Sequence, residues 1–288
     1  MMDFQAFSPF VVPLAVVLGL LVGSFLNVVI YRIPVIMERG WTTFSKEHLN
    51  LPLSDEEKQP FNLMLPKSRC PKCHAGVKAW QNIPVISYLF LGGRCASCRT
   101  PISKRYPLVE ILTALLFGIV AWRYGWSMLT FGGLVFTAML LALTFIDADT
   151  QYLPDSLTLP LIWLGLLFNY DGTFVSLQQA VLGAVFGYMS LWSLNYIHKL
   201  IRGMDGMGGG DFKLLAALGA WMGVSVLPII VLVAALVGVI AAVILKAAKS
   251  QPIAFGPCLA IAGLLAFAGY EDVMMGVNWW LRASGFTV

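Results

Sequence analysis

The chain has 288 residues, of which 58% are hydrophobic and 12% are charged, and its net charge is +4. Soluble domains carry about a quarter charged residues, so this composition excludes an ordinary soluble enzyme with one buried core. Apolar stretches recur from Pro9 to the C-terminus. They are long enough to cross roughly 30 Å of hydrocarbon, which takes about 20 helical residues. An all-α polytopic membrane protein is therefore predicted.

The first apolar stretch, residues 9–30, lacks the basic start and the small-residue cleavage site of a signal peptide, so it is interpreted as a retained transmembrane helix. Further helices are expected at residues 107–124, 127–146, 157–169, 177–198, 212–223, 226–245 and 254–269. The helices at 157–169 and 212–223 are shorter than a full crossing, so tilted, partial or water-lined helices are expected there. The expected total is about eight transmembrane helices.

The basic residues predict the orientation, because Lys and Arg in short loops are retained on the cytoplasmic side. If segment 32–105 lies in the cytoplasm, 17 of the 19 basic residues are on the cytoplasmic side, and only Arg123 and Arg282 are outside. This topology places the N-terminus in the periplasm. This segment holds 12 basic and 5 acidic residues, a net charge of 12 − 5 = +7. Anionic lipid headgroups are an expected partner of such a face. Nucleic acid is not expected, because the aromatic residues there are not interleaved as a stacking platform.

Two C-x2-C pairs lie in this segment, Cys70 with Cys73 and Cys95 with Cys98, separated by 21 residues. Four thiolates can close a tetrahedral zinc site, although the gap is slightly longer than in most zinc ribbons. The alternatives are His74 in place of one thiolate, two disulfides, or four unrelated thiols, and a reducing cytoplasm argues against disulfides. One structural Zn²⁺ per chain is predicted, which would supply folding free energy that so small a segment lacks.

Two aspartates stand at the ends of predicted membrane helices, where ionisable groups are costly and generally face protein or water. Asp147 directly follows the apolar run 127–146, and Asp211 follows a run of glycines and precedes residues 212–223. The predicted topology puts both at the cytoplasmic level. Carboxylates that meet there would share a proton, so that one activates water while the other protonates a leaving amide. The alternative is that Asp211 is an N-cap and Asp147 an interfacial anchor.

The glycines before Asp211 suggest a second feature of the site. Glycine permits backbone dihedrals that are closed to other residues, and it removes the side chain that would hold a peptide backbone away. A substrate strand is therefore expected to approach Asp211 closely.

Gly208-Gly209-Gly210-Asp211 reads as G-x-G-D, and the segment from Asp147 to Pro154 reads as D-x6-P. In these motifs the chain resembles the type 4 prepilin peptidases. The resemblance extends to both cysteine pairs and to two further segments, Gly23-Ser24-Phe25-Leu26-Asn27 and Lys104-Arg105-Tyr106-Pro107-Leu108-Val109-Glu110. The resemblance implies that Asp147 and Asp211 are catalytic, and the D-x6-P spacing selects Asp147 over Asp149 and Asp155.

The resemblance also implies two activities and a location. The enzymes of this family cleave the leader peptide of type IV prepilins or type II secretion pseudopilins at the cytoplasmic face of the bacterial inner membrane. They then N-methylate the new N-terminal residue with S-adenosylmethionine, for which no motif in this sequence marks a site. The expected domains are residues 1–31, a first transmembrane helix; 32–106, a cytoplasmic zinc-binding domain; and 107–288, a membrane aspartyl protease domain.

The alternatives are a transporter and a membrane scaffold. A proton- or ion-coupled transporter would use intramembrane carboxylates, but it predicts inverted repeats and midplane charges, and the sequence shows neither. A membrane scaffold would use the cysteine segment to bind a partner, and its aspartates would have no catalytic role.

Overall fold

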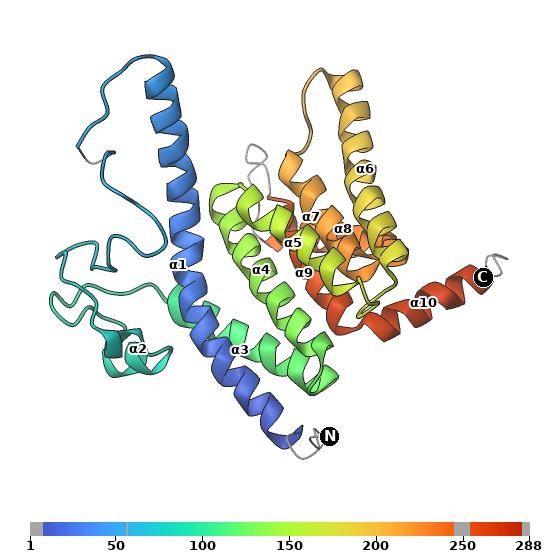
Figure 1. The fold of residues 1–288 in the computed structure, drawn as a ribbon, viewed down its shortest axis with the longest axis horizontal. Helices are drawn as coiled ribbons and strands as arrows, with labels where there is room; N and C mark the ends of the chain where they lie inside the picture. The colour runs from blue at the N-terminus through green and yellow to red at the C-terminus, as the bar shows by residue number, and fades with distance from the viewer. Residues whose placement is uncertain (1–7, 56, 245–253, 284–288) are drawn as a thin grey trace. The chain divides into compact units, whose positions relative to one another are not determined.

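The structure, a computed structural model, describes residues 8–55, 57–244 and 254–283. Within these ranges the regular secondary structure is helical, with isolated β-bridges and no strand (Figure 1). It divides into two compact units, Met1–Trp126 and Ser127–Val288. The expected all-α architecture is confirmed, and each unit has its own helix packing.

The first unit is built on two long helices that pack against each other, α1 (Ser8–His48) and α3 (Arg105–Tyr124). Between them in sequence lie the short helices η2 (Ala79–Asn82) and α2 (Ile86–Phe90). Gly19 and Gly23, one turn apart on α1, allow the close packing. A Cβ on Gly19 would lie 2.6 Å from the Cα of Ala114, and one on Gly23 would lie 2.7 Å from the Cα of Glu110. Small residues at this spacing let membrane helices approach closely.

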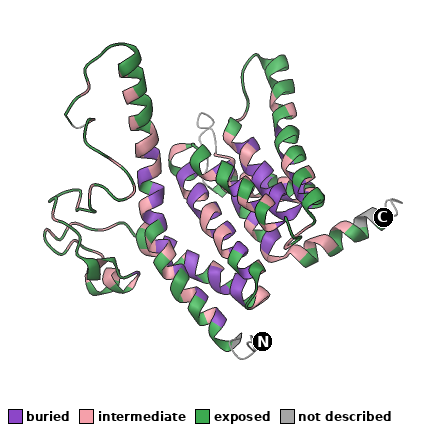
Figure 2. Cartoon of the chain, viewed as in Figure 1, coloured by how far each residue is buried: buried purple, intermediate pink, exposed green. Residues whose placement is uncertain are grey.

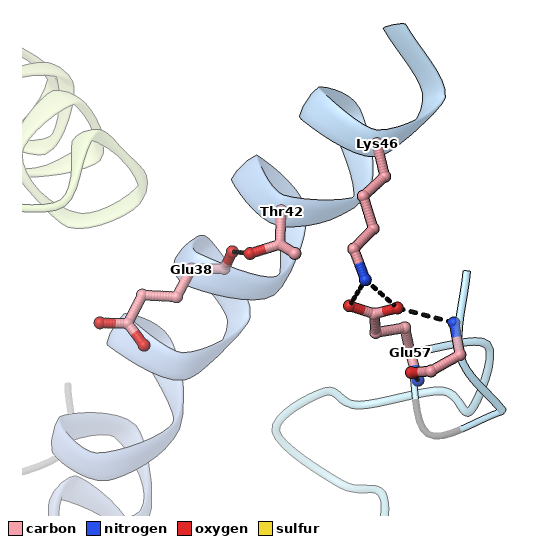
Figure 3. A network of polar contacts seen from close by, with 5 residues as sticks. Glu38, Thr42, Lys46 and Glu57 are labelled. Atoms are coloured by element: carbon pink, nitrogen blue, oxygen red, sulfur yellow. Dashed lines mark hydrogen bonds and ion pairs between the residues drawn. The ribbon is translucent and has the colours of Figure 1, made fainter. Parts of the chain in front are cut away.

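Helix α1 continues to His48, so its expected end at Ile30 was placed too early. The expectation followed the end of the apolar run, but polar helix formers continue the helix and Pro34 is accommodated within it. Near its end, Lys46 donates to Oε1 and Oε2 of Glu57 at 2.6 and 2.8 Å (Figure 3). The hydrogen bond from Lys46 is the largest cause that lowers the pKa of Glu57 to about 2. This pair ties the following loop back to α1.

The second unit contains seven α-helices among the described residues. They are α4 (Met128–Thr150), α5 (Asp155–Phe168), α6 (Leu177–Arg202), α7 (Gly209–Met222), α8 (Leu227–Ile244), α9 (Gly256–Ala268) and α10 (Tyr270–Ala283), with the short η3 (Val224–Val226) before α8. Every helix expected in this part of the chain is present, with ends shifted by a few residues. Leu245, an expected helix end, lies outside the described residues. Helix α10 was not expected.

The expected number of membrane crossings is not confirmed. Among the described residues, five helical segments are long and apolar enough to cross: α1, α3, α4, α6 and η3 with α8. A sixth results if the bent pair α9 and α10 counts as one span. Helices α5 and α7 have 14 residues each, about 21 Å at 1.5 Å per residue, which is shorter than the roughly 30 Å hydrocarbon core.

Helix α7 is short because protein, not lipid, surrounds it. Its residues are buried almost without interruption from Asp211 to Met222 (Figure 2). It packs against α5, α6 and α9. On α6, Gly183 meets Gly219 of α7 so closely that neither position has room for a Cβ. One turn further, a Cβ on Gly187 would lie 2.6 Å from the carbonyl oxygen of Leu215.

The C-terminal end of α7 is fixed by buried hydrogen bonds. Asn169, after α5, donates from Nδ2 to the carbonyl oxygens of Ala220 at 2.9 Å and Trp221 at 3.2 Å. Its Oδ1 accepts from the backbone N–H groups of Phe174 and Val175. The Trp221 ring packs against the rings of Phe136, Phe168 and Phe174. These contacts leave the helix little freedom to rotate or slide.

The α6–α7 contact gives a test of the packing. Gly183→Ala is expected to lower the free energy of unfolding by about 1–3 kcal/mol, because the new methyl group has no space. Gly276→Ala on α10 is the matched control, since a Cβ there meets nothing described within 4 Å. It should leave stability unchanged or raise it slightly. Thermal unfolding of the purified protein measures both, and equal stability of the two variants would contradict the packing.

Candidate functional site

Asp147 lies in the last turn of α4, as expected, and is only 4% exposed. The helix ends at Gln151, whose backbone is left-handed and whose N–H donates to the Asp147 carbonyl oxygen at 2.9 Å. Within the described part of the chain, Oδ2 of Asp147 is buried without a hydrogen-bond partner. A buried carboxylate oxygen without a partner is costly, and a catalytic role is one explanation for such a group.

Asp211 lies within the first turn of α7 and not before the helix, which is a small difference from the sequence prediction. Gly208 is the N-cap residue, and the N–H of Asp211 donates to its carbonyl oxygen at 3.2 Å. Asp211 is therefore not the N-cap, although its position in the first turn still suits a negative charge. Its side chain is 8% exposed. Both candidate catalytic carboxyls are thus buried.

The two aspartates lie at the same end of the second unit, where α4 ends and α7 and α9 begin. A Cβ on Gly256, at the start of α9, would lie 2.5 Å from Oδ2 of Asp147. Asp147 and Asp211 are close enough to repel each other electrostatically, and the Cys258 thiol lies within range of both charges. Residues more than sixty positions apart in sequence are therefore brought to one site.

Leu153 connects the two motifs. A Cβ on Gly210 would lie 2.6 Å from the Cβ of Leu153, and one on Gly256 would lie 3.0 Å from its Cδ1. The Leu153 side chain thus fills the space between the two glycines. This contact places the D-x6-P loop against the start of both α7 and α9.

The glycines of the G-x-G-D motif work differently from the expectation. None of Gly208, Gly209 and Gly210 has a positive φ angle in the described backbone, so unusual dihedrals are not their role. Gly210 is instead required for the approach to Leu153. At Gly208 and Gly209 a Cβ would meet no described atom within 4 Å, so the backbone beside Asp211 is open on that side.

The neighbouring acids have other environments. Asp155 forms an ion pair with Lys213, at 2.6 Å between Oδ1 and Nζ, which links the start of α5 to the N-terminal part of α7. Asp149 is exposed. Of the three acids in the Asp147 segment, only Asp147 is buried against α9.

The four predicted metal ligands are brought together in the first unit. Their Sγ atoms all lie within 4.8 Å of one another, and Cys70 lies 3.7 Å from Cys98 and Cys73 lies 4.0 Å from Cys95. A tetrahedral zinc with Zn–S bonds of about 2.3 Å requires S–S distances of about 3.8 Å. The four cysteines therefore fit a metal ion.

The two cysteine loops repeat one backbone pattern. The N–H of the first cysteine donates to a carbonyl oxygen five residues later, from Cys70 to Ala75 and from Cys95 to Thr100. The fourth residue after each first cysteine, His74 and Arg99, has a positive φ angle. The Thr100 hydroxyl, as the largest cause, lowers the pKa of Cys98 to about 6, which favours the thiolate that binds metal. His74 lies at the turn itself.

Sequence reasoning did not find the anchors that hold this cysteine segment to α1 and α3. The guanidinium of Arg32 donates to the carbonyl oxygens of Asn62 at 2.7 Å and Pro66 at 2.6 Å. The buried Glu110 accepts the Val85 N–H at 2.7 Å. Val85 has φ 57°, an unfavourable conformation for a β-branched residue. In the sequence, the signal for the Glu110 anchor was a polar residue near the start of the predicted apolar helix 107–124.

Comparison with known proteins agrees with this arrangement. The chain matches the "Bacterial Peptidase A24 N-terminal domain" over residues 17–124 and the "Type IV leader peptidase family" over residues 134–243. A prepilin leader peptidase/N-methyltransferase of Neisseria gonorrhoeae is 64% identical over 98% of both chains. The chain belongs to the type IV leader peptidase family. A second relative of the same name, from Pseudomonas aeruginosa, is 50% identical over 99% of both chains.

The family membership confirms the resemblance drawn from the sequence motifs. With its long apolar helices, it also makes the chain a multi-pass membrane protein. No solved structure shows a significant match to this leader peptidase.

Two adjacent glycines test the geometry of the G-x-G-D motif. Gly210→Ala is expected to reduce leader-peptide cleavage by at least about tenfold, because its methyl group displaces Leu153 and with it the first turn of α7. A tenfold loss in rate requires the activation barrier to rise by only about 1.4 kcal/mol. Gly209→Ala should retain cleavage, because its Cβ has open space. A cleavage assay on membranes with matched expression measures both. Equal activity of the two variants would contradict the role given to Leu153.

Proposed function

We propose that this chain cleaves the leader peptide of type IV prepilins, type II secretion pseudopilins or both, and then N-methylates the new N-terminal residue. Relatives with 64% and 50% identity over nearly the whole chain carry both activities in their name. No observation on the described residues favours a transporter. The main structural support for the protease activity is the buried pair of carboxyl groups, Asp147 and Asp211, at one end of the second unit.

The chemistry assigned to the pair is that of an aspartyl protease. Asp147 and Asp211 repel each other in a buried setting, so they hold one proton between them. The ionised partner removes a proton from water, and the protonated partner donates to the leaving amide nitrogen. The open backbone at Gly208 and Gly209 leaves room beside Asp211 for an extended peptide.

The location of the site follows from charge. The positive-inside rule places the +7 segment, residues 32–105, in the cytoplasm, and the same topology places Asp147 and Asp211 at the cytoplasmic face of the inner membrane. A pilin-like substrate with an apolar helix would hold its cleavage site at that level. The basic segment is proposed to bind anionic lipid headgroups.

The cysteine cluster is proposed to bind one structural Zn²⁺ per chain through Cys70, Cys73, Cys95 and Cys98. All four tetrahedral positions are then filled by protein, so the metal would stabilise the fold of the segment and take no part in peptide cleavage. We assign residues 32–106 as the zinc-binding domain, between the first transmembrane helix at 1–31 and the protease domain at 107–288. S-adenosylmethionine is the proposed methyl donor, on the strength of the relatives' name.

The dyad is tested by Asp147→Asn and Asp211→Asn. Each variant should lose about 10²–10⁴-fold in prepilin cleavage, because an amide cannot exchange the shared proton. Each should still methylate a pilin supplied without its leader. Cleavage is followed by gel and methylation by mass spectrometry of the same product.

Asp149→Asn is the matched control, since it makes the same change at an exposed carboxylate two residues away. It should cleave at the rate of the wild type. Cleavage by both dyad variants at that rate would refute the assignment. Loss of both activities in both variants would show a single shared site.

The metal is tested by composition. The purified wild-type protein should contain one zinc per chain, and Cys70→Ser with Cys73→Ser should remove it, since two of four ligands are lost. Cys258→Ser should keep the metal, because Cys258 lies in α9 and not in the cluster. Mass spectrometry of the metal content measures all three proteins. An unchanged zinc content in the double variant would refute the four-cysteine site.

A further inference from the structure

Helix α10 differs in character from the helices before it. It follows α9 after the single residue Gly269, and the two helices are bent by 89° at this break. Figure 1 shows α10 turning away from the end of α9. The Tyr270 hydroxyl at its start donates to the carbonyl oxygen of Met222 at 3.4 Å. Helix α10 therefore begins at the C-terminal end of α7.

This position is at the end of the second unit opposite the aspartate pair. Helix α7 begins at Asp211 and ends at Met222, and α9 begins beside Asp147 and ends at Ala268. Both helices thus run from the aspartate end to the end that carries α10. If α7 and α9 stand upright in the membrane, a helix bent by 89° from α9 runs along the membrane plane.

The side chains of α10 sort into two faces. Val273, Met274 and Val277, at helical spacing, form a half-buried apolar face. Glu271, Asn278 and Arg282 form an exposed polar stripe beside this face, on a different side of the helix. A helix of this pattern is neither a membrane-crossing helix nor a wholly solvated one.

We propose that α10 lies in the lipid interface of the membrane leaflet opposite the aspartate pair, with its apolar face toward the acyl chains. Crossing the hydrocarbon would bury Glu271, Asp272 and Arg282, at a cost of several kcal/mol. Remaining in water would leave the half-buried apolar face partly in contact with solvent. The interface accommodates both faces.

Apolar burial, and not attraction between charges, would hold α10 at the lipid interface. Its two acidic residues and one basic residue give a charge of 1 − 2 = −1, in contrast to the +7 of residues 32–105. Binding of α10 is therefore independent of anionic lipid and of salt, whereas the basic segment responds to both.

Photolabelling of the full-length wild-type protein tests the placement. Nanodiscs of phosphatidylethanolamine and phosphatidylglycerol carry a diazirine lipid with its reactive group either at the headgroup or at the end of an acyl chain. The headgroup probe should label residues 270–283, and the acyl-end probe should label α8 but not these residues. The pattern should persist when phosphatidylglycerol is omitted. Acyl-end labelling of residues 270–283 at the level of α8, or no labelling by either probe, would overturn the proposal.

A matched pair of variants tests the orientation. Val277→Asp places a charge on the apolar face, and Asn278→Asp places the same charge one residue later on the polar stripe. In nanodiscs, Val277→Asp should increase amide exchange several-fold in residues 270–283, with α4 and α7 unchanged as a check on folding. Asn278→Asp should exchange like the wild type. Equal exchange in the two variants would contradict a lipid-facing side.

Discussion

The second unit depends on the direct contact of two glycines, Gly183 on α6 and Gly219 on α7. Because neither has a side chain, the two helices approach until their backbones touch. This approach lets α7 sit in the middle of the unit, where a helix of only 14 residues needs no lipid contact. As a result, the first turn of α7, which carries Asp211, lies inside the protein.

The same arrangement explains why the two sequence motifs have their particular form. The central helix is held at one end by Asn169 and at the other by the Lys213–Asp155 ion pair, so its first turn has a fixed position. Leu153 then packs between Gly210 and Gly256, which brings the Asp147 segment to that turn. The variable position of G-x-G-D falls on Gly209, where a Cβ has space. Steric contacts, and not unusual backbone dihedrals, therefore explain why glycine is needed in this motif.

Much of this arrangement could be predicted from the sequence, because apolar runs and short motifs are local signals. The helices of the second unit, the cysteine pairs and the two aspartates followed directly from them. The end of α1 could not be predicted in this way, since hydrophobicity reports removal from water and not helix length. The number of crossings could not be fixed from the sequence either, because a helix buried in protein, such as α7, is as apolar as one in lipid. Helix α10 was missed because its two faces average to a weakly polar segment.

Glu110 and Asp147 show how two buried carboxylates in one chain can have different roles. Each lies against a glycine that permits close packing, Gly23 for Glu110 and Gly256 for Asp147. Glu110 accepts the Val85 N–H, which compensates for its burial and holds a strained loop. Oδ2 of Asp147 has no such partner within the described residues, and Asp211 adds a second negative charge nearby. A carboxylate held by a backbone hydrogen bond stabilises structure, whereas a buried carboxylate oxygen beside another acid gains most from a proton or a water molecule, which is the requirement for peptide hydrolysis.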